Sequence, residues 1–161
     1  MHYISGYVII KKDKEVCILK DSIEFLIRAI SRRSEKLANQ QLAQFDLTST
    51  QFRTLMYIYH HPPMTVRQCD LEAFFSKSNP AVTGILNNME QKDLIRRVTN
   101  PEDGRSKVLM VTEKAIALIP QLDSYRGWMD KLLTENMTEE EVDILIVLLK
   151  KLRNNANLRD Q

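Results

Sequence analysis

The sequence predicts a mainly α-helical fold with one small β-hairpin, and three features carry this prediction. A long segment, residues 16–46, has apolar residues at helical spacing and contains neither proline nor glycine. Three shorter segments then begin with residues that favour a helix N-terminus. Two runs rich in Val, Ile and Leu follow, separated by turn-forming residues. The expected order is long helix, three short helices, hairpin and two long helices.

The first helix is expected over residues 16–46. Charged residues such as Arg28, Arg32 and Glu35 occupy the faces that the apolar residues leave free. A helix of this length exceeds what one small domain covers, so we expect it to pack against a second copy of the chain. The preceding residues, 1–15, fit either a short strand or a flexible arm.

Three shorter helices are expected next. Thr48 and Gln51 have the spacing of a capping box, and Pro62 ends the helix that they open. Thr65 and Gln68 repeat this pattern and predict the start of a second helix.

A third short helix begins with either Ser78 or Asn79 as its cap, and Pro80 suits its first turn. Only a few residues separate it from the helix before. This spacing predicts a helix-turn-helix arrangement.

The hairpin is expected from LIRRVTN, residues 94–100, and SKVLMVT, residues 106–112, with PEDGR between them. Its tip carries Gly104 and Arg105. One interpretation is an ordinary charged, solvated turn. The other is a finger that places Arg105 against a negatively charged partner, with Asp103 pairing with the guanidinium.

The last third of the chain, residues 113–161, predicts two amphipathic helices. Thr112 caps the first, and Thr138 with Glu141 forms a capping box for the second. Apolar residues of the second helix repeat at about seven-residue spacing, which favours packing against another helix. We expect these helices to contribute to a dimer interface.

Charge and cysteine content narrow the function classes. The chain has 23 basic and 21 acidic residues, a net charge of +2, which excludes a histone-like polycation but allows a local basic face. Residues 48–112 hold eight Lys or Arg against six Asp or Glu. Two distant cysteines form neither a disulfide framework nor a zinc site, and this favours a reducing cytoplasm. No apolar run is long enough to span a membrane.

No pattern of an enzyme is visible. The sequence has no nucleophile with its base, no metal-ligand spacing and no phosphate-binding loop, so we expect no catalytic activity, no cofactor and no metal. His60 and His61 are adjacent, and their side chains diverge on a helix.

The sequence resembles the MarR family of winged helix-turn-helix transcription regulators over about residues 20–155. The resemblance is carried by three stretches in the right order and spacing: LTSTQFRTLMYI, AVTGILNNMEQKDLIRR and NPEDGRSKVLMVTEKA. The last is similar to the family's wing, with a D-x-R core.

The resemblance implies a winged helix-turn-helix domain at residues 47–112, flanked by dimerisation helices at 16–46 and 113–161. It implies a homodimer that binds a near-palindromic operator in double-stranded DNA, and we expect a repressor. It further implies that a small ligand or oxidation relieves operator binding.

The third short helix would then be the recognition helix. Polar side chains in its first turns can contact base edges, and Asn can bind adenine through two hydrogen bonds. The alternative for each residue is a solvated helix face. The candidate DNA-reading residues are Ser78, Asn79, Ala81, Thr83 and Asn87.

The hairpin would be the wing. Arg105 is expected to enter the minor groove, where narrow A/T tracts concentrate negative potential. Asp103 and Lys107 belong to the same candidate site. Lys77, Arg96 and Arg97 are candidates for phosphate contacts, and singly each could be merely solvated.

Two positions depart from the family pattern. Gly84 stands in the recognition helix where relatives often carry Arg, and Asp93 stands where relatives usually have a glycine in the left-handed region. Gly84 and the low net charge keep open an alternative function, a winged-helix protein-interaction module that does not bind DNA.

Residues for a regulatory signal are harder to identify. Tyr57, Tyr59 and Trp128 are candidates for a pocket that takes a small apolar or aromatic effector, although such residues are often core. Cys17 is a candidate redox residue, with a small buried thiol as the alternative. We expect Cys69 to be buried.

Overall fold

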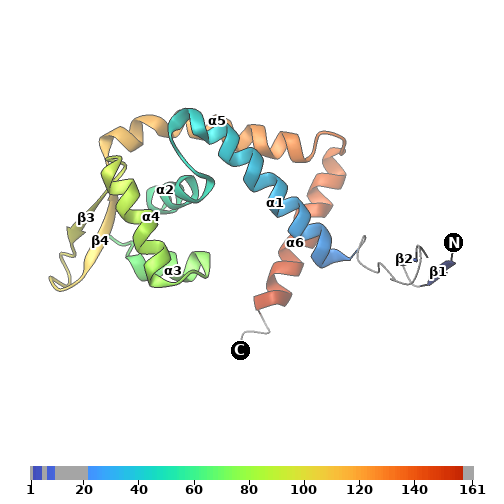
Figure 1. Ribbon diagram of the computed structural model, residues 1–161, viewed down its shortest axis with the longest axis horizontal. Helices are drawn as coiled ribbons and strands as arrows, with labels where there is room; N and C mark the ends of the chain where they lie inside the picture. The colour runs from blue at the N-terminus through green and yellow to red at the C-terminus, as the bar shows by residue number, and fades with distance from the viewer. Residues whose placement is uncertain (1, 5–6, 10–21, 158–161) are drawn as a thin grey trace. The chain divides into compact units, whose positions relative to one another are not determined.

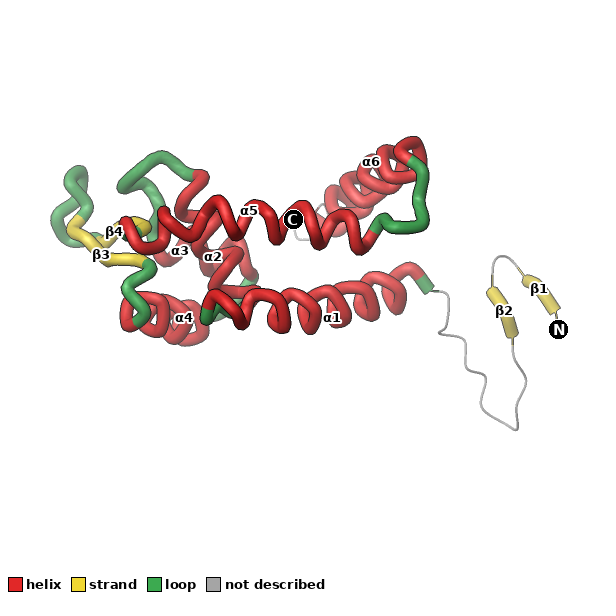
Figure 2. The backbone as a smooth tube through the Cα atoms, turned by 90° about the horizontal axis from the view of Figure 1, so that it is seen from above, coloured by secondary structure: helices red, strands yellow, loops and turns green. Residues whose placement is uncertain are grey.

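The computed structural model describes residues 2–4, 7–9 and 22–157, and the chain divides into two compact units at Pro120 (Figures 1 and 2). The first unit holds two short strand pairs, helices α1 to α4 and the start of α5; the second holds the rest of α5 and α6. The elements are β1 (His2–Ile4), β2 (Tyr7–Ile9), α1 (Ile23–Leu42), the 3-10 helix η1 (Ala43–Phe45), α2 (Ser49–His60), α3 (Gln68–Phe75), α4 (Asn79–Gln91), β3 (Ile95–Thr99), β4 (Lys107–Val111), α5 (Glu113–Leu133) and α6 (Glu139–Asn157).

The predicted fold class is confirmed: the described chain is mainly helical, with a hairpin after the third short helix. The structure adds a second antiparallel pair, β1 with β2, in the segment for which a strand or an arm was open.

Helix α1 is shorter than the predicted segment 16–46. It begins at Ile23 because Ser22 caps it: Ser22 has an extended backbone, and its hydroxyl accepts a hydrogen bond from the Phe25 N–H at 3.1 Å. It ends at Leu42, where the chain tightens into η1 and then turns at Asp46, whose φ of 55° is left-handed. Residues 16–21 lie outside the described part.

Helix α2 begins as predicted. The Thr48 hydroxyl accepts a hydrogen bond from the Gln51 N–H, and the Gln51 amide oxygen accepts one from the Thr48 N–H. The helix ends at His60, just before the two prolines.

Helix α3 begins three residues later than the predicted cap, Thr65. Val66 is held in an extended segment, because its carbonyl accepts a hydrogen bond from the Leu109 N–H of β4 at 2.8 Å. The helix starts after Arg67, whose N–H donates to the carboxylate of Asp70 at 2.7 Å. The prediction at Thr65 was wrong because a tertiary contact to the hairpin outweighs a local capping pattern.

Helix α4 begins after Ser78, with Pro80 in its first turn. The hairpin follows directly: β3 pairs with β4 from Ile95↔Val111 to Thr99↔Lys107. Asp93, between helix and hairpin, has a φ of 53° and so takes the left-handed conformation expected at this position. Figure 1 shows the hairpin extending away from α2, α3 and α4.

The core of the first unit lies between α2, α3, α4, the hairpin and the start of α5. Every element of the helix-turn-helix and the hairpin contributes at least one side chain that is almost fully buried. These residues include Leu55 of α2, Leu71 of α3, Val82, Leu86 and Met89 of α4, Ile95 and Val108 of the hairpin, and Ala115 of α5.

Helices α5 and α6 have the caps that the sequence predicts. The Thr112 hydroxyl accepts from the Ala115 N–H at 3.2 Å, and Thr138 and Glu141 form a reciprocal capping box. Within residues 2–4, 7–9 and 22–157, no helix combines the length and apolarity that crossing a bilayer would need.

Candidate nucleic-acid interface

One face of α4 is free to contact a partner. Val82, Leu86 and Met89 are buried on the opposite face. At 100° per residue, Gly84 lies nearly opposite the centre of that buried face. Asn87 flanks it, and both are exposed.

Two of the predicted reading residues are already bound within the helix-turn-helix. The Gln68 amide donates to the Thr83 hydroxyl at 2.8 Å, and the Asn79 amide donates to the Glu72 carboxylate at 2.7 Å. Gln68 also donates to Glu72 at 3.0 Å. These polar contacts join α3 to α4, so Asn79 and Thr83 have a structural role that the sequence did not indicate.

Asn87 is bound by the hairpin rather than by α3. The Arg97 guanidinium of β3 donates to its Oδ1 at 2.9 Å and also forms an ion pair with the Glu90 carboxylate. The second oxygen of Glu90 accepts the Arg97 N–H at 3.0 Å. Arg97 was predicted as a phosphate contact, and in the structure it links the base of the hairpin to α4.

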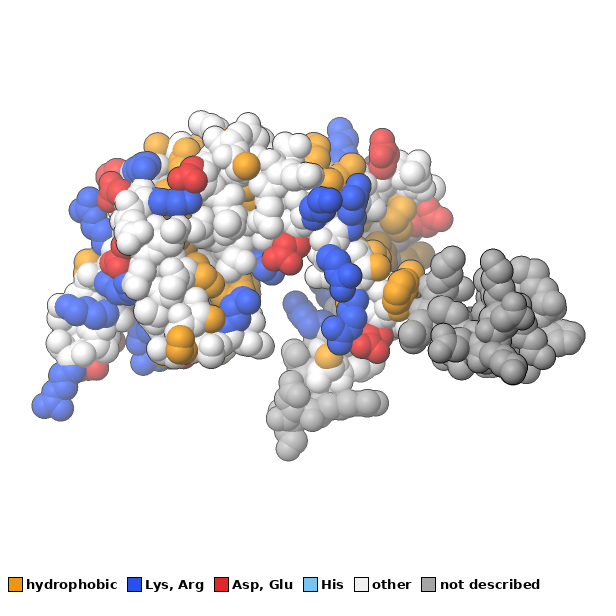
Figure 3. Space-filling model, viewed as in Figure 1, with side chains coloured by type: hydrophobic (Ala, Val, Ile, Leu, Met, Phe, Trp, Pro, Cys, Tyr) orange, Lys and Arg blue, Asp and Glu red, His pale blue; other side chains and the backbone are white. Residues whose placement is uncertain are grey.

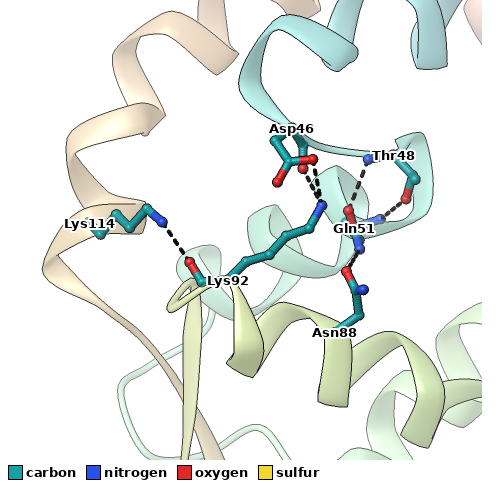
Figure 4. A network of polar contacts seen from close by, with 6 residues as sticks. All are labelled: Asp46, Thr48, Gln51, Asn88, Lys92 and Lys114. Atoms are coloured by element: carbon teal, nitrogen blue, oxygen red, sulfur yellow. Dashed lines mark hydrogen bonds and ion pairs between the residues drawn. The ribbon is translucent and has the colours of Figure 1, made fainter.

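Figure 4 shows a third set of contacts, which joins α4 to the start of α2 and the preceding turn. Gln51, which the capping box fixes, donates to the Asn88 Oδ1 at 2.5 Å. Lys92, at the end of α4, donates to the Asp46 carbonyl at 2.5 Å and pairs with its carboxylate at 3.0 Å. Lys114 of α5 donates to the Lys92 carbonyl at 2.7 Å. These contacts hold the C-terminal end of α4, and those of Asn79 and Thr83 hold its first turns.

An open groove runs between α4, α1 and the first turn of α2. Because Ala81 and Gly84 are small, the groove extends along the outer side of α4. Lys77 supplies a positive charge at one end, and it is exposed there as predicted.

The hairpin tip is shaped by side chains that bond to the backbone. Asn100 accepts a hydrogen bond from the Glu102 N–H, and its own N–H donates to the Ser106 carbonyl at 3.0 Å. The Ser106 hydroxyl donates to the Asp103 carbonyl at 3.2 Å. These contacts hold the turn without help from Gly104, which is outside the left-handed region and whose Cβ would meet no atom within 4 Å.

The predicted pairing of Asp103 with the Arg105 guanidinium is wrong. The Asp103 carboxylate accepts the Arg105 backbone N–H at 3.1 Å, an Asx-type turn, so it shapes the loop rather than holding the cation. Arg105 is exposed at the tip, and Figure 3 shows a basic side chain projecting from the end of the hairpin.

The remaining basic candidates are at the surface. Arg96 is exposed and pairs loosely with Asp93 at 3.5 Å. Lys107 is exposed and donates to the Thr99 hydroxyl at 2.8 Å. Of the predicted basic contacts, Lys77, Arg96, Arg105 and Lys107 are therefore exposed.

Of the predicted effector residues, Tyr57 and Tyr59 lie on α2 in the first unit, and Trp128 lies on the part of α5 in the second unit. Tyr57 stacks on His61 at 4.1 Å between ring centroids and contacts Phe74 at 4.6 Å, while the exposed Tyr59 has His60 as its ring neighbour. In the second unit, an open pocket is lined by Trp128, Lys131, Leu132, Thr134 and Glu135.

Of the two cysteines, only Cys69 lies in the described part of the chain. Cys17 lies outside the described residues. Cys69 is exposed rather than buried, since α3 begins at Gln68 and turns Leu71, not Cys69, toward the core.

Sequence reasoning missed Gln51, Gln68, Glu72 and Asn88 as parts of this interface. The capping pattern did identify Gln51, but its second hydrogen bond joins residues 37 positions apart. No local signal indicates such a contact.

Comparisons with known proteins agree with this geometry. A family model described as MarR family matches residues 47–107. The chain is 31% identical over 128 residues to the multiple antibiotic resistance protein MarR of Salmonella typhimurium, covering 79% of this chain and 88% of that protein.

Solved structures give the same result. A crystal structure of S. aureus MepR in complex with DNA is similar with a TM-score of 0.76 and 31% identity, covering 84% of this chain and 99% of that one. A mutant of E. coli MarR complexed with operator DNA is similar with a TM-score of 0.72 and 28% identity. The match covers 81% of this chain and 92% of that one. From its helix-turn-helix, its hairpin and these similarities, the chain belongs to the MarR family of winged helix-turn-helix transcription regulators.

Proposed function

We propose that this protein is a dimeric repressor that binds a near-palindromic operator, with α4 in the major groove and the hairpin beside it. The observation that carries the proposal is the exposed outer face of α4 next to a projecting hairpin with Arg105 at its tip. The similarity to MepR and MarR structures that contain DNA supports it.

Charge supports a DNA partner for this surface. Lys77, Arg96, Arg105 and Lys107 are exposed. A phosphate backbone attracts such cations without regard to sequence, while the helix between them contacts base edges. The minor groove is the proposed site of Arg105, because this side chain is exposed in the loop between β3 and β4.

Two exposed apolar faces, one in each unit, support a dimer. Exposed apolar surface on this scale is unusual for a monomer and marks an interface. On α1 the exposed residues are Ile23, Phe25, Leu26, Ile27 and Ile30, and on α6 they are Ile144, Ile146, Val147, Leu148, Leu149 and Leu152.

The DNA-binding proposal is tested with duplexes selected from a random pool by the full chain. We expect the selected duplex to bind more tightly than a scrambled one, with an affinity that falls steeply as salt rises. Equal affinity for both duplexes would overturn sequence-specific binding. No binding to any duplex would favour the protein-interaction alternative.

The dimer is tested by Leu148→Glu, which places a charge on the exposed apolar face of α6. We expect monomers in sedimentation experiments and loss of operator binding. Lys150→Glu on the same helix is the control, because Lys150 is exposed and polar. A Leu148→Glu protein that remains dimeric would exclude this face as the interface.

Relief by a small aromatic effector is part of the same proposal, and the pocket beside Trp128 is its candidate site because it combines an indole ring with Lys131. Trp128 is the only tryptophan of the chain. Its fluorescence should therefore change when an aromatic acid that weakens operator binding is added, and unchanged fluorescence would exclude the pocket.

A further inference from the structure

We infer that Lys92 and Lys114 are positioning residues that set the half-site spacing of the operator. Through their ammonium groups, the C-terminal end of α4 is linked to the turn that ends α1 and to the first turn of α5. Both roles rest on the proposed function, and they add to it the side chains that hold the two α4 helices of a dimer at a fixed separation.

The turns that follow α1 and α4 are built alike. Each contains an aspartate in the left-handed conformation, Asp46 with a φ of 55° and Asp93 with a φ of 53°. In each turn, the aspartate N–H donates to the carbonyl three positions earlier, and the next N–H donates to the carbonyl five positions earlier. The residues joined by the second of these bonds are apolar and buried: Leu42 with Leu47, and Met89 with Leu94. Both turns therefore have a fixed backbone.

Lys92 joins the two turns, as Figure 4 shows. Its ammonium donates to the Asp46 carbonyl at 2.5 Å and lies 3.0 Å from the Asp46 carboxylate. The Lys92 side chain is only 24% exposed, whereas that of Asp46 is 83% exposed. A charged donor bound to a fixed backbone carbonyl is a stronger restraint than an ion pair with an exposed carboxylate. The carbonyl is therefore the contact that holds α4 to the end of α1.

The start of α5 is bound to the same turn of α4. The Lys114 ammonium donates to the Lys92 carbonyl at 2.7 Å, and the Thr112 hydroxyl donates to the Asp93 carbonyl at 2.7 Å. Carbonyls at the C-terminal end of a helix lack partners within that helix, so outside donors bind there. The turn at Asp93 is thus the point at which α1, α4 and α5 are linked.

These links bear on DNA binding because a dimer contacts two half-sites. The two recognition helices enter major grooves about one helical turn, or about 34 Å, apart. One inserted base pair moves a half-site by about 3.4 Å and rotates it by about 34°. A helix α4 that is held to α1 and α5 cannot follow this change, whereas a helix freed from these links can. The links therefore produce a preference for one spacing.

The experiment measures the affinity of the full chain for three duplexes: the selected operator, and the same operator with one base pair inserted or removed between its half-sites. Wild-type affinity should fall at least about tenfold with either change, the scale of one lost base contact. Lys92→Met keeps most of the side-chain length and removes the ammonium. A hydrogen bond from a charged donor contributes a factor of about ten, so the spacing penalty of this variant should shrink to less than about threefold. Lys114→Met should shrink it less, because Lys114 is exposed.

Two variants and one duplex serve as controls. Asp46→Asn keeps the carbonyl and tolerates the left-handed conformation, so its spacing penalty should equal that of the wild type. Lys107→Met removes an exposed cation of the hairpin and should weaken binding to all three duplexes by the same factor. On a duplex with a single half-site, Lys92→Met should keep the wild-type base preference, which separates a change in position from damage to the reading surface.

An unchanged spacing penalty in Lys92→Met would overturn the assignment, and so would an equal reduction in Lys107→Met, because charge alone would then explain it. If Lys92→Met does not fold, as judged by circular dichroism, Lys114→Met decides, and an unchanged penalty there has the same meaning. If the wild-type protein selects no DNA with two half-sites, the proposed function itself fails, which is a different result.

Discussion

Helix α4 and the hairpin differ in how their polar side chains are held. On α4, Asn79, Thr83, Asn87 and Asn88 each have a hydrogen-bond partner on α2, α3 or β3. At the hairpin tip, internal bonds shape the backbone, while the Arg105 guanidinium projects outward.

The difference indicates a division of tasks. Side chains that are held before binding lose little entropy when they meet a base, so they can discriminate between similar partners. A free cation on a projecting loop adapts to phosphates or to a groove, and it contributes affinity that salt weakens. We therefore expect α4 to determine specificity and the hairpin to contribute affinity.

The largest effect is expected for Arg97→Ala, which tests whether α4 and the hairpin are joined by this side chain. The change removes an ion pair whose partners are only 23% and 33% exposed and leaves Glu90 without its cation. We expect the free energy of unfolding in urea to fall by about 2 kcal/mol.

Arg96→Ala is the control for that experiment. Its side chain is 71% exposed and pairs at 3.5 Å, so its removal should change stability by less than about 0.5 kcal/mol. Equal losses in the two variants would contradict the linking role of Arg97.

A somewhat smaller loss is expected for Gln51→Ala. Gln51 is buried, closes the α2 capping box and fixes Asn88. Losing the side-chain half of the capping box and one buried contact should cost about 1.5 kcal/mol in urea unfolding and should blur the base preference of α4. Gln91→Ala is the control: Gln91 is exposed at the end of α4, and its loss should change neither the free energy of unfolding nor the base preference. A Gln51→Ala variant that keeps full stability would show that α4 is held by other contacts.

For Arg105→Ala the comparison predicts an effect on DNA binding alone. Affinity for the selected operator should fall about fivefold at low salt, and the slope of log affinity against log salt should decrease in magnitude by about 1. The free energy of unfolding should stay within about 0.3 kcal/mol, because only the backbone of Arg105 is bonded inside the loop. A changed base preference at the positions in front of α4 would break the proposed division.

The smallest effect is expected for Gly84→Ala. Its Cβ would meet open space, so the substitution should stabilise the helix by about 0.5–1 kcal/mol. Gly127→Ala in α5 meets equally open space and should give a similar gain in thermal unfolding. Destabilisation by Gly84→Ala alone would mean that the glycine is required by the fold of α4 itself.

By itself, the sequence determined the order of the elements, most of their ends and the family. These properties depend on local chemistry: apolar spacing selects helix or strand, a Thr directly before a helix can cap it, and prolines end one. The caps at Thr48, Thr112 and Thr138 form as predicted for this reason. The exposed position of Arg105 at a hairpin tip follows from the same local rules.

Only the tertiary structure decided what each polar side chain of the interface binds. Val66 pairs with β4 and delays the start of α3, Arg97 turns to Glu90 and Asn87 instead of to solvent, and Gln51 reaches Asn88. A long polar side chain has several partners within reach, and the packing of distant segments selects among them. The local sequence around a residue does not contain that information.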